Sequence, residues 1–570
     1  MTTRTRIPRS SEALTGATWG DIRPWYESLA RARLDRDSAE SWLREWSRLE
    51  AVVSEAASLA MIAYTCDTAD PAKQAAHLRF STEIVPRAEE QSIRLARRVV
   101  ELGEVPEGME TTVQRFRAAI DIFREANVPI TSELEELASR YQRITGGMTA
   151  VWDGEERPLP MLTPYLQDRD REVRERAFRG MVDPYVAQAG PLADLFNQMF
   201  ERRQRIARNA DFRDFHAYSF VARQRFDYTA ADCARFHDAV EAVVVPAHTR
   251  ALAARRERLE VETLRPWDLA VNPYRDTPLR PFQSGAELAR GVQRIMGAVD
   301  PAFGLQVQTM IDEKLLDLES RRGKAPGGYC DTLHVRGRPF IFMNAAGVLE
   351  DINTLLHEAG HAFHAFAAHL LPYVWQRHPG AEAAELASMT MELLAGRHLG
   401  PPAGMLSEED AAIARLEHLE DLLSSLPHIA SVDAFQTWVY TSGEGQDPAA
   451  RDQAWLRIRS RFEQAVDWAG LVKERVARWS RQLHIYLYPF YYIEYGLAQL
   501  GALQVWRNQR REGPAAIDAY RRFLALGATR SLPELYRAAG ATLVFDAAGM
   551  RPLIDMVEEE MERLRHALKA

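Results

Sequence analysis

The chain has 570 residues, of which 46% are hydrophobic and 26% are charged, and its formal net charge is −9. These values are ordinary for globular proteins and argue against a disordered, collagen-like or membrane-embedded chain. The charge includes no long basic run, so a nucleic-acid partner is not expected.

The cysteines and the N-terminus bear on where the protein works. Cys66, Cys233 and Cys330 lie far apart, which excludes a CxxC metal site and favours a reducing compartment. The N-terminus has no apolar segment of the signal-peptide type, and no uninterrupted apolar run approaches the roughly 18 residues of a membrane span. We therefore expect a cytoplasmic protein with no membrane partner.

The first third of the chain is predicted to be helical. From Trp42 to Ala56, apolar residues recur at helical spacing and form one face that must be buried. Breaks at Asp70-Pro71 and between Gly103 and Gly108 separate the helical stretches. These breaks are candidate boundaries between lobes.

Strand signals are few and short. Residues 149–152 favour a strand, and Asp153-Gly154 after them predicts a hairpin. Helices predominate again later, for example where Thr229 and Asp232 form an N-cap pattern. The clearest strand signal is Pro339–Asn344, shortly before the motif described next.

The sequence His357-Glu358-Ala359-Gly360-His361 is an HExxH motif. On a helix, histidines at i and i+4 lie on one face, so both rings can bind the same zinc ion. Glu358 lies beside them and could accept a proton from a water molecule that attacks a carbonyl group. The flanking residues contain no helix breaker, which supports a helix here.

A catalytic zinc site needs a third protein ligand and an open position. Glu382, Glu385 and Glu392 are candidates on the predicted helix that follows. Glu385 and Glu392 are two turns apart on one face, which favours Glu385 as the ligand and Glu392 as its supporting partner. Alternatively, Glu382 is an ordinary first-turn acid and Glu392 forms a structural ion pair.

His364 also lies on the side of the helix that carries His361. A fourth protein ligand would close the open position, so His364 is interpreted as a supporting residue or as a core residue with satisfied hydrogen bonds. A metzincin would have glycine at this position, and that class is therefore excluded.

A concentration of aromatic residues follows near the C-terminus, in the stretch 484–495. Tyrosine hydroxyls aimed at a substrate carbonyl could stabilise the developing oxyanion. We therefore predict that Tyr488 and Tyr495 act there with His484 assisting. The alternative is an aromatic packing cluster with its hydroxyls at the surface.

Several of these segments together resemble the M3 family of thimet oligopeptidases, in particular its oligoendopeptidase F branch. The resemblance spans most of the chain and rests on five segments: GGYC at 327–330, the strand at 339–344, HEAGHAFH at 357–364, ELASMTME at 385–392, and HIYLYPFYYIEY at 484–495. It implies a mainly α, two-lobed zincin-type fold with a small β-sheet next to the HExxH helix and a deep substrate channel.

The resemblance also implies functional roles. It implies one Zn²⁺ per chain bound by His357, His361 and Glu385, with Glu358 as the base and His484, Tyr488 and Tyr495 at the substrate carbonyl. The substrates it implies are short peptides. The chain would divide into an N-terminal helical lobe (1–105), a helical and hairpin region of the oligopeptidase F type (106–190), and a catalytic region (191–570).

The strand before the motif is a candidate peptide-binding element. An exposed strand edge can pair with an extended peptide, and Phe340, Phe342 and Asn344 are therefore predicted to bind substrate. The alternative is an interior strand.

Two other functions remain open at this point. One is a zinc carboxypeptidase or peptidyl-dipeptidase of the same architecture, which would release products only from substrate C-termini. The other is a peptide-binding protein without turnover, although the presence of Glu358 argues against it. The oligomeric state is also open, a monomer included.

Overall fold

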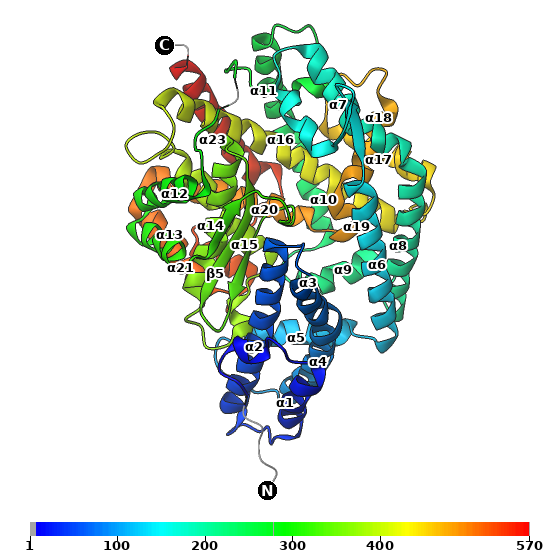
Figure 1. Cartoon of the computed structure of the whole chain (residues 1–570), viewed down its shortest axis with the longest axis vertical. Helices are drawn as coiled ribbons and strands as arrows, with labels where there is room; N and C mark the ends of the chain where they lie inside the picture. Colours follow the sequence, from blue (N-terminus) through cyan, green and yellow to red (C-terminus); the bar gives the residue numbers. More distant parts are fainter. Residues whose placement is uncertain (1–6, 278, 569–570) are drawn as a thin grey trace. The chain divides into compact units, whose positions relative to one another are not determined.

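The structure is a computed structural model that describes residues 7–277 and 279–568. The chain divides into two compact units, each built from separate segments (Figure 1). The first unit comprises Met1–Asp121, Leu279–Ala414 and Ala498–Leu543, and the second comprises Ile122–Pro278, Arg415–Leu497 and Val544–Ala570. The consecutive regions 1–105, 106–190 and 191–570 do not follow this division, because the chain returns to the first unit late in the sequence.

The first unit contains the following elements: η1 Ser11–Leu14, α1 Trp19–Arg31, α2 Ala39–Cys66, α3 Pro71–Leu78, η2 Arg79–Ile84, α4 Val85–Leu102, α5 Glu110–Ile122, α12 Gly285–Val299, α13 Pro301–Asp312, β3 Leu316–Glu319, β4 Tyr329–Leu333, β5 Arg338–Ala345, α14 Leu349–Ala368, η7 Val374–Arg377, α15 Ala381–Gly396, α21 Pro514–Leu526 and α22 Leu532–Ala538. Unit boundaries fall inside α16 Glu408–Thr441 and α20 Tyr492–Glu512, and a further one separates Ile122 from the rest of α5.

The second unit contains the following elements: η3 Glu125–Asn127, α6 Val128–Gly146, β1 Thr149–Trp152, β2 Glu155–Pro158, η4 Leu159–Gln167, α7 Arg171–Ala187, α8 Ala189–Asn209, α9 Phe215–Ala222, α10 Ala230–Ala239, η5 Val240–Val244, α11 Val245–Arg258, η6 Pro266–Asp268, α17 Pro448–Phe462, α18 Val472–Arg481, α19 Leu483–Leu487 and α23 Ala547–Ala567. The prediction of a mainly α fold with a small sheet beside the HExxH helix is confirmed.

The N-terminal helices form where the sequence predicts them. The apolar face from Trp42 to Ala56 lies on α2 and is buried in a core with α1 and α4. Asp70 caps α3 at Pro71, and α4 ends at Gly103, whose φ of 74° stops the helix. Among the described residues, α2 is long and apolar enough to cross a membrane by length and composition, a test that a core helix also passes.

The three-stranded sheet has the order β3-β5-β4. β5 pairs in parallel with β3 and, over Arg338–Phe342, antiparallel with β4, so both of its backbone edges are occupied where the two neighbours overlap. Around Ile341 and Phe342 the strand is therefore interior, which is the alternative that the sequence left open, because a hydrophobic pattern marks a strand without showing how many neighbours it has. β3 and β4 are the edges of this sheet.

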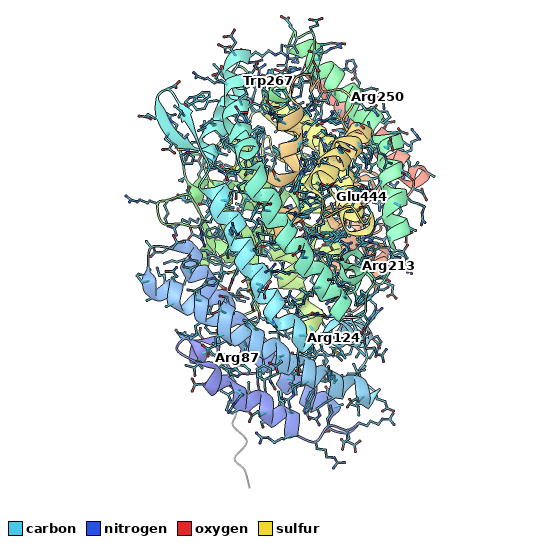
Figure 2. All side chains as sticks on the ribbon, turned by 90° about the vertical axis from the view of Figure 1, so that its right-hand side faces the viewer. Arg87, Arg124, Arg213, Arg250, Trp267 and Glu444 are labelled. Atoms are coloured by element: carbon cyan, nitrogen blue, oxygen red, sulfur yellow. The ribbon has the colours of Figure 1, made fainter. Side chains whose placement is uncertain are left out.

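Two residues labelled in Figure 2 illustrate the surface and the core of the second unit. Figure 2 labels Arg250 on α11, which is exposed and forms an ion pair of 2.7 Å with Glu558 on α23. The same figure labels Trp267, which is buried in a cluster with Trp468. The predicted hairpin is confirmed: β1 and β2 pair antiparallel around Asp153-Gly154.

Candidate metal centre

The HExxH motif lies on α14, directly after the sheet. The helix begins where Asp351 accepts hydrogen bonds of 2.8 and 2.9 Å from the backbone N–H groups of Ala346 and Val348. It then packs against β4 and β5. His357 and His361 follow one turn apart, with ring centroids separated by 5.0 Å and ring planes at 85°. The i, i+4 spacing thus brings the two rings together as predicted.

The approach of α15 to α14 depends on Gly360, the residue before His361. A Cβ atom at this position would lie 2.5 Å from the Cα atom of Ser388 and 2.7 Å from the carbonyl oxygen of Ala387. Only glycine therefore allows the two backbones to come this close. The contact brings Glu385, one turn before Ser388, to the histidines. This role of Gly360 was not predicted from the sequence.

His357, His361 and Glu385 form a group whose ligand atoms all lie within 4.8 Å of one another. Glu385 Oε2 is 3.4 Å from His357 Nε2 and 3.8 Å from His361 Nε2. Two imidazole nitrogens and one carboxylate oxygen converging in this way are a donor set that suits zinc and leaves a further position open. These residues fit the predicted ion.

Other side chains orient two members of this group. Glu392 Oε1 lies 2.6 Å from His357 Nδ1, so this nitrogen donates a proton to the carboxylate and Nε2 is left for a metal. Ser388 Oγ donates to Glu385 Oε2 at 3.1 Å. The predicted supporting position of Glu392 agrees with this geometry. Ser388 was missed, although its place three residues after Glu385 on a helix was a usable signal.

The electrostatics of the group follow from burial and crowded carboxylates. Burial, together with the charges of Glu385 and Glu392, raises the pKa of Glu358 to about 7. Burial lowers the pKa of His361 to about 4. For His357, burial opposes the charged ring, but the hydrogen bonds to Glu385 and Glu392 outweigh it and raise the pKa.

Two further candidates lie outside the metal group. Glu382 is buried in the first turn of α15 and interacts with the Arg115 guanidinium, so it is neither a ligand nor a solvated acid. His364 is buried with its ring centroid 5.4 Å from that of Phe523. Neither of its nitrogens has a hydrogen-bond partner in the described part of the chain, so its role as a bonded support is not seen.

The predicted substrate-binding residues of β5 are largely engaged within the first unit. Phe342 is buried and stacks on Tyr329, with ring centroids 5.0 Å apart. Asn344 Nδ2 donates to the carbonyl oxygens of Ala325 and Gly327 at 2.8 and 2.9 Å. The Asn344 amide therefore holds the loop before β4. Phe340 is half-buried.

Lys324 anchors the same loop and was not identified from the sequence. Its side chain has no exposed surface, and its ammonium group donates to the Asp317 carboxylate and to the carbonyl oxygens of Asp317, Glu319 and Met343, at 2.6 to 2.9 Å. A lone lysine in a loop gives no sequence signal for such a role.

The aromatic residues near the C-terminus do cluster, in the second unit. The His484 ring centroid lies 5.9 Å from that of Tyr488 and 6.3 Å from that of Tyr495. Tyr492, which was not singled out, is closer still at 4.8 Å. Tyr488 is 53% exposed, so its ring is not part of a packed core.

Comparison with known proteins identifies the family of the chain. The profile described as Peptidase family M3 matches residues 164–553, and that of the Peptidase M3 N-terminal domain matches residues 26–125. The solved structure of Pz peptidase A with an inhibitor superposes with a TM-score of 0.86 and 27% identity, covering 98% of this chain and 99% of that one. Oligoendopeptidase F from Enterococcus faecium shares the fold, with a TM-score of 0.65 and 15% identity over 98% and 99% of the two chains.

Curated relatives match shorter parts of the chain. Oligopeptidase PepF of Bacillus subtilis is 22% identical over 71% of this chain and 59% of its own length. The chromosomal oligoendopeptidase F of Lactococcus lactis is 29% identical over 26% of this chain and 24% of its own length. The matches thus span less than two thirds of these two relatives. Because the first profile covers more than half of the sequence and includes the HExxH helix, the chain belongs to peptidase family M3.

Proposed function

We propose that this chain is a zinc-dependent oligopeptidase that hydrolyses internal bonds of short peptides. The observation that carries the proposal is the convergence of His357, His361 and Glu385 with the buried carboxylate of Glu358 beside them. Membership of peptidase family M3 supports peptide hydrolysis. The names oligopeptidase and oligoendopeptidase, carried by relatives, favour short peptides and internal cleavage.

The proposed mechanism assigns the proton transfers to Glu358. A zinc ion held by the three donors would supply Lewis acidity to the attacking water molecule and to the peptide carbonyl. The Glu358 carboxylate accepts the proton of that water molecule and delivers it to the leaving amine. Burial raises the pKa of the Glu358 carboxyl above its ordinary value, which strengthens the carboxylate as a base. Glu392 keeps the His357 ring in the orientation that the reaction needs.

Two groups of residues are proposed to act on the peptide itself. His484, Tyr488 and Tyr495 would donate hydrogen bonds to the carbonyl oxygen as negative charge develops on it. The exposed ring of Tyr488 supports this role, because its hydroxyl is not confined to a core. Phe340 is proposed to contact a substrate side chain. The proposed location is the cytoplasm, which three free cysteines favour.

The proposal can be tested with a mixed pool of short peptides and one small folded protein. The pool is incubated with zinc-loaded protein, with Glu358→Gln and with Glu350→Gln, an exposed glutamate on the same helix. Mass spectrometry then identifies every product. We expect internal cleavage of short peptides by the wild type and by Glu350→Gln, and at least a hundredfold slower cleavage by Glu358→Gln.

The other outcomes separate the alternatives. Products that arise only from substrate C-termini would favour a carboxypeptidase or peptidyl-dipeptidase. An intact pool with wild-type protein would contradict catalysis and favour a peptide-binding protein. Equal cleavage by wild type and Glu358→Gln would leave a peptidase but remove Glu358 as its base.

A further inference from the structure

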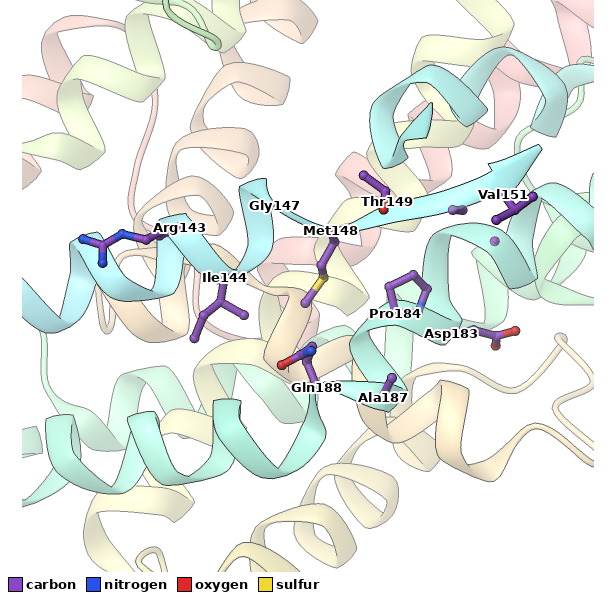
Figure 3. Close-up of a pocket in the computed structure, with 12 residues that line it drawn as sticks. Arg143, Ile144, Gly147, Met148, Thr149, Val151, Asp183, Pro184, Ala187 and Gln188 are labelled. Atoms are coloured by element: carbon purple, nitrogen blue, oxygen red, sulfur yellow. The ribbon is translucent and has the colours of Figure 1, made fainter. Parts of the chain in front are cut away.

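The second unit contains a pocket of 740 Å³ that the proposed reaction does not use. It lies where α6 ends and β1 begins, beside the last turns of α7 (Figure 3). Its lining includes Ile144 of α6, Met148 to Val151 at β1, and Pro184 of α7. None of the metal ligands and none of the aromatic cluster residues lines it.

The turn of the hairpin determines which backbone groups of β1 face outward. Asp153 and Gly154 have φ values of 53° and 83°, as in a two-residue turn of type I′. In such a hairpin the pair next to the turn, Trp152 and Glu155, is hydrogen-bonded, and the pairs then alternate. The N–H and C=O groups of Thr149 and Val151 therefore point away from β2.

These outward groups lack partners within residues 7–277 and 279–568. No backbone or side-chain hydrogen bond to the N–H or C=O of Thr149 or Val151 is formed on the outer side of β1. The residues lie in the pocket lining, and the Val151 side chain is 76% exposed. Ala150 and Trp152 instead face a small core with Met181 of α7, which fixes the strand in place.

The two edges of the hairpin differ in their protection. β2 presents Glu156 and Pro158 at its outward positions, and a charge and a proline both discourage pairing with a further strand. β1 presents Thr149 and Val151 at its outward positions, and neither residue is charged or a proline. An unprotected edge that lines a pocket is suited to accept an extended peptide.

Opposite charges stand at the two ends of the pocket. Figure 3 shows Arg143 in the last turn of α6 at one end of the pocket, and Asp183 of α7 at the end where Val151 lies, both turned toward the ends and not toward the middle. Neither side chain forms an ion pair of 4 Å or less with a described residue, and the charges of Arg179 and Glu474 act on Asp183 in opposite directions. A peptide antiparallel to β1 would run from Val151 to Thr149 and place its amino end toward Asp183 and its carboxylate toward Arg143. The charges thus match an antiparallel peptide and oppose a parallel one.

We propose that this pocket binds a short peptide with free termini, which adds to β1 as an antiparallel strand and directs its terminal carboxylate toward Arg143. The site belongs to the second unit, whereas all the metal ligands belong to the first, so the proposal does not rest on the proposed hydrolysis. Its ligand is recognised by main-chain groups, and the side chains of the peptide contribute less.

Hydrogen exchange with mass spectrometry tests the strand pairing. The zinc-loaded full-length Glu358→Gln protein is mixed with the pentapeptide Thr-Val-Thr-Val-Thr, and exchange is followed in the segment 148–152. We expect severalfold slower exchange there when the peptide is present. Val151→Pro removes the outward N–H without breaking the pairing to β2 and should abolish this protection. Glu156→Pro, the same change at the paired position on the other edge, should retain it.

The carboxylate is tested separately, with a measurement that does not depend on proline variants folding. We expect the free-acid peptide to bind about tenfold more tightly than its C-terminal amide, a difference typical of a charged hydrogen bond. Arg143→Gln should remove this difference, whereas Arg140→Gln, an exposed arginine one turn earlier on α6, should preserve it.

Several results would overturn the proposal. These are unchanged exchange in segment 148–152, equal loss of protection in both proline variants, and equal binding of acid and amide. If the wild-type protein forms concentration-dependent dimers and Val151→Pro does not, the β1 edge binds a second copy of the chain instead of a peptide. Mass spectrometry of the recovered peptide shows whether Glu358→Gln has cleaved it, which separates a failure of the proposed catalytic base from a failure of this site.

Discussion

His357 is held on both sides of its imidazole ring. Glu392 accepts from Nδ1 at 2.6 Å, and Glu385 lies 3.4 Å from Nε2. A ring with one nitrogen committed to a carboxylate has a fixed tautomer and a more basic second nitrogen. The two glutamates therefore have different tasks, although they lie on one face of α15.

Replacement of these glutamates should separate ligand from non-ligand positions. Glu385→Gln removes an anionic donor and is expected to abolish stoichiometric zinc binding, measured by metal analysis after dialysis. Glu382→Gln, on the same helix but facing Arg115, should retain one zinc per chain. Zinc retained by Glu385→Gln and lost by Glu382→Gln would reassign the third ligand.

Because Glu392 is proposed to support His357 and not to bind zinc itself, its replacement should reduce zinc affinity less than Glu385→Gln does. Glu392→Gln should weaken zinc binding by about 10- to 100-fold, because the His357 ring loses its charged anchor while all three donors remain. Competition with a chromophoric chelator measures the affinity. An affinity equal to that of the wild type would show that the contact with His357 does not orient the ring for metal binding.

At the scale of single residues, the sequence revealed groups whose chemistry depends on spacing along one helix. His357, His361, Glu385 and Glu392 were all predicted in this way, and the structure brings their side chains together. Lys324 was not identified and Asn344 was not correctly interpreted, because many of their partners are backbone carbonyl oxygens, and such partners leave no pattern in a sequence. Asn344 was predicted to face substrate, and its amide is instead occupied by the loop.

At the scale of elements, the close contact of α14 with α15 depends on Gly360, which has no side chain. Gly360→Ala should force the helices apart, lowering the free energy of unfolding by about 1–3 kcal/mol and weakening zinc binding, since Glu385 would move from the histidines. Urea unfolding and zinc titration measure the two effects. Gly190→Ala is the control, because nothing lies within 4 Å of a Cβ atom at that position of α8. Equal stability of both variants would contradict the argument.

The positions of helices and strands along the chain were predicted better than the way in which the strands pair. The helices of the N-terminal segment, the hairpin and the strand before the motif all lie where periodicity and turn residues indicated. The position of β5 in the middle of its sheet was not predicted, because β3 and β4 are short and only weakly marked in sequence. Hydrophobic pattern gives the class of an element, whereas pairing depends on segments elsewhere.

At the scale of the whole molecule, zinc should stabilise one unit selectively. Metal bound only by the folded state adds about 2.7 kcal/mol of stability when the free concentration is 100 times Kd. Because the three ligands belong to the first unit, zinc should slow hydrogen exchange in α14 and α15 and leave α17 and α18 unchanged. Equal protection in both units would show that they unfold together. His361→Ala should show no zinc-dependent change in either.

The second unit should instead respond to acid through Glu463. This carboxylate is buried among Arg459, Arg475 and Arg478. Burial opposes ionisation, but the guanidinium groups outweigh it and lower the pKa to about 2. Because the folded pKa lies below the unfolded value, the carboxylate stabilises the fold above about pH 4.5, and this contribution is lost as the pH falls toward 2.

Glu463→Gln should therefore cost on the order of 3 kcal/mol at pH 7, and the difference from wild type should shrink between pH 5 and pH 2. Urea unfolding across this range measures it, with the exposed Glu444→Gln as the control (Figure 2). A difference that does not change with pH would contradict ionisation of Glu463 as the cause.

The helix contact at Gly360 also bears on biosynthesis. The ligands come from α14 and α15, which follow one another in the chain, so their assembly closes one short loop and costs little chain entropy. The helices α21 and α22, which pack against this pair, are synthesised more than a hundred residues later. The helix pair α14 and α15, which carries the metal ligands, can thus form on the ribosome before the polypeptide that completes its unit has emerged.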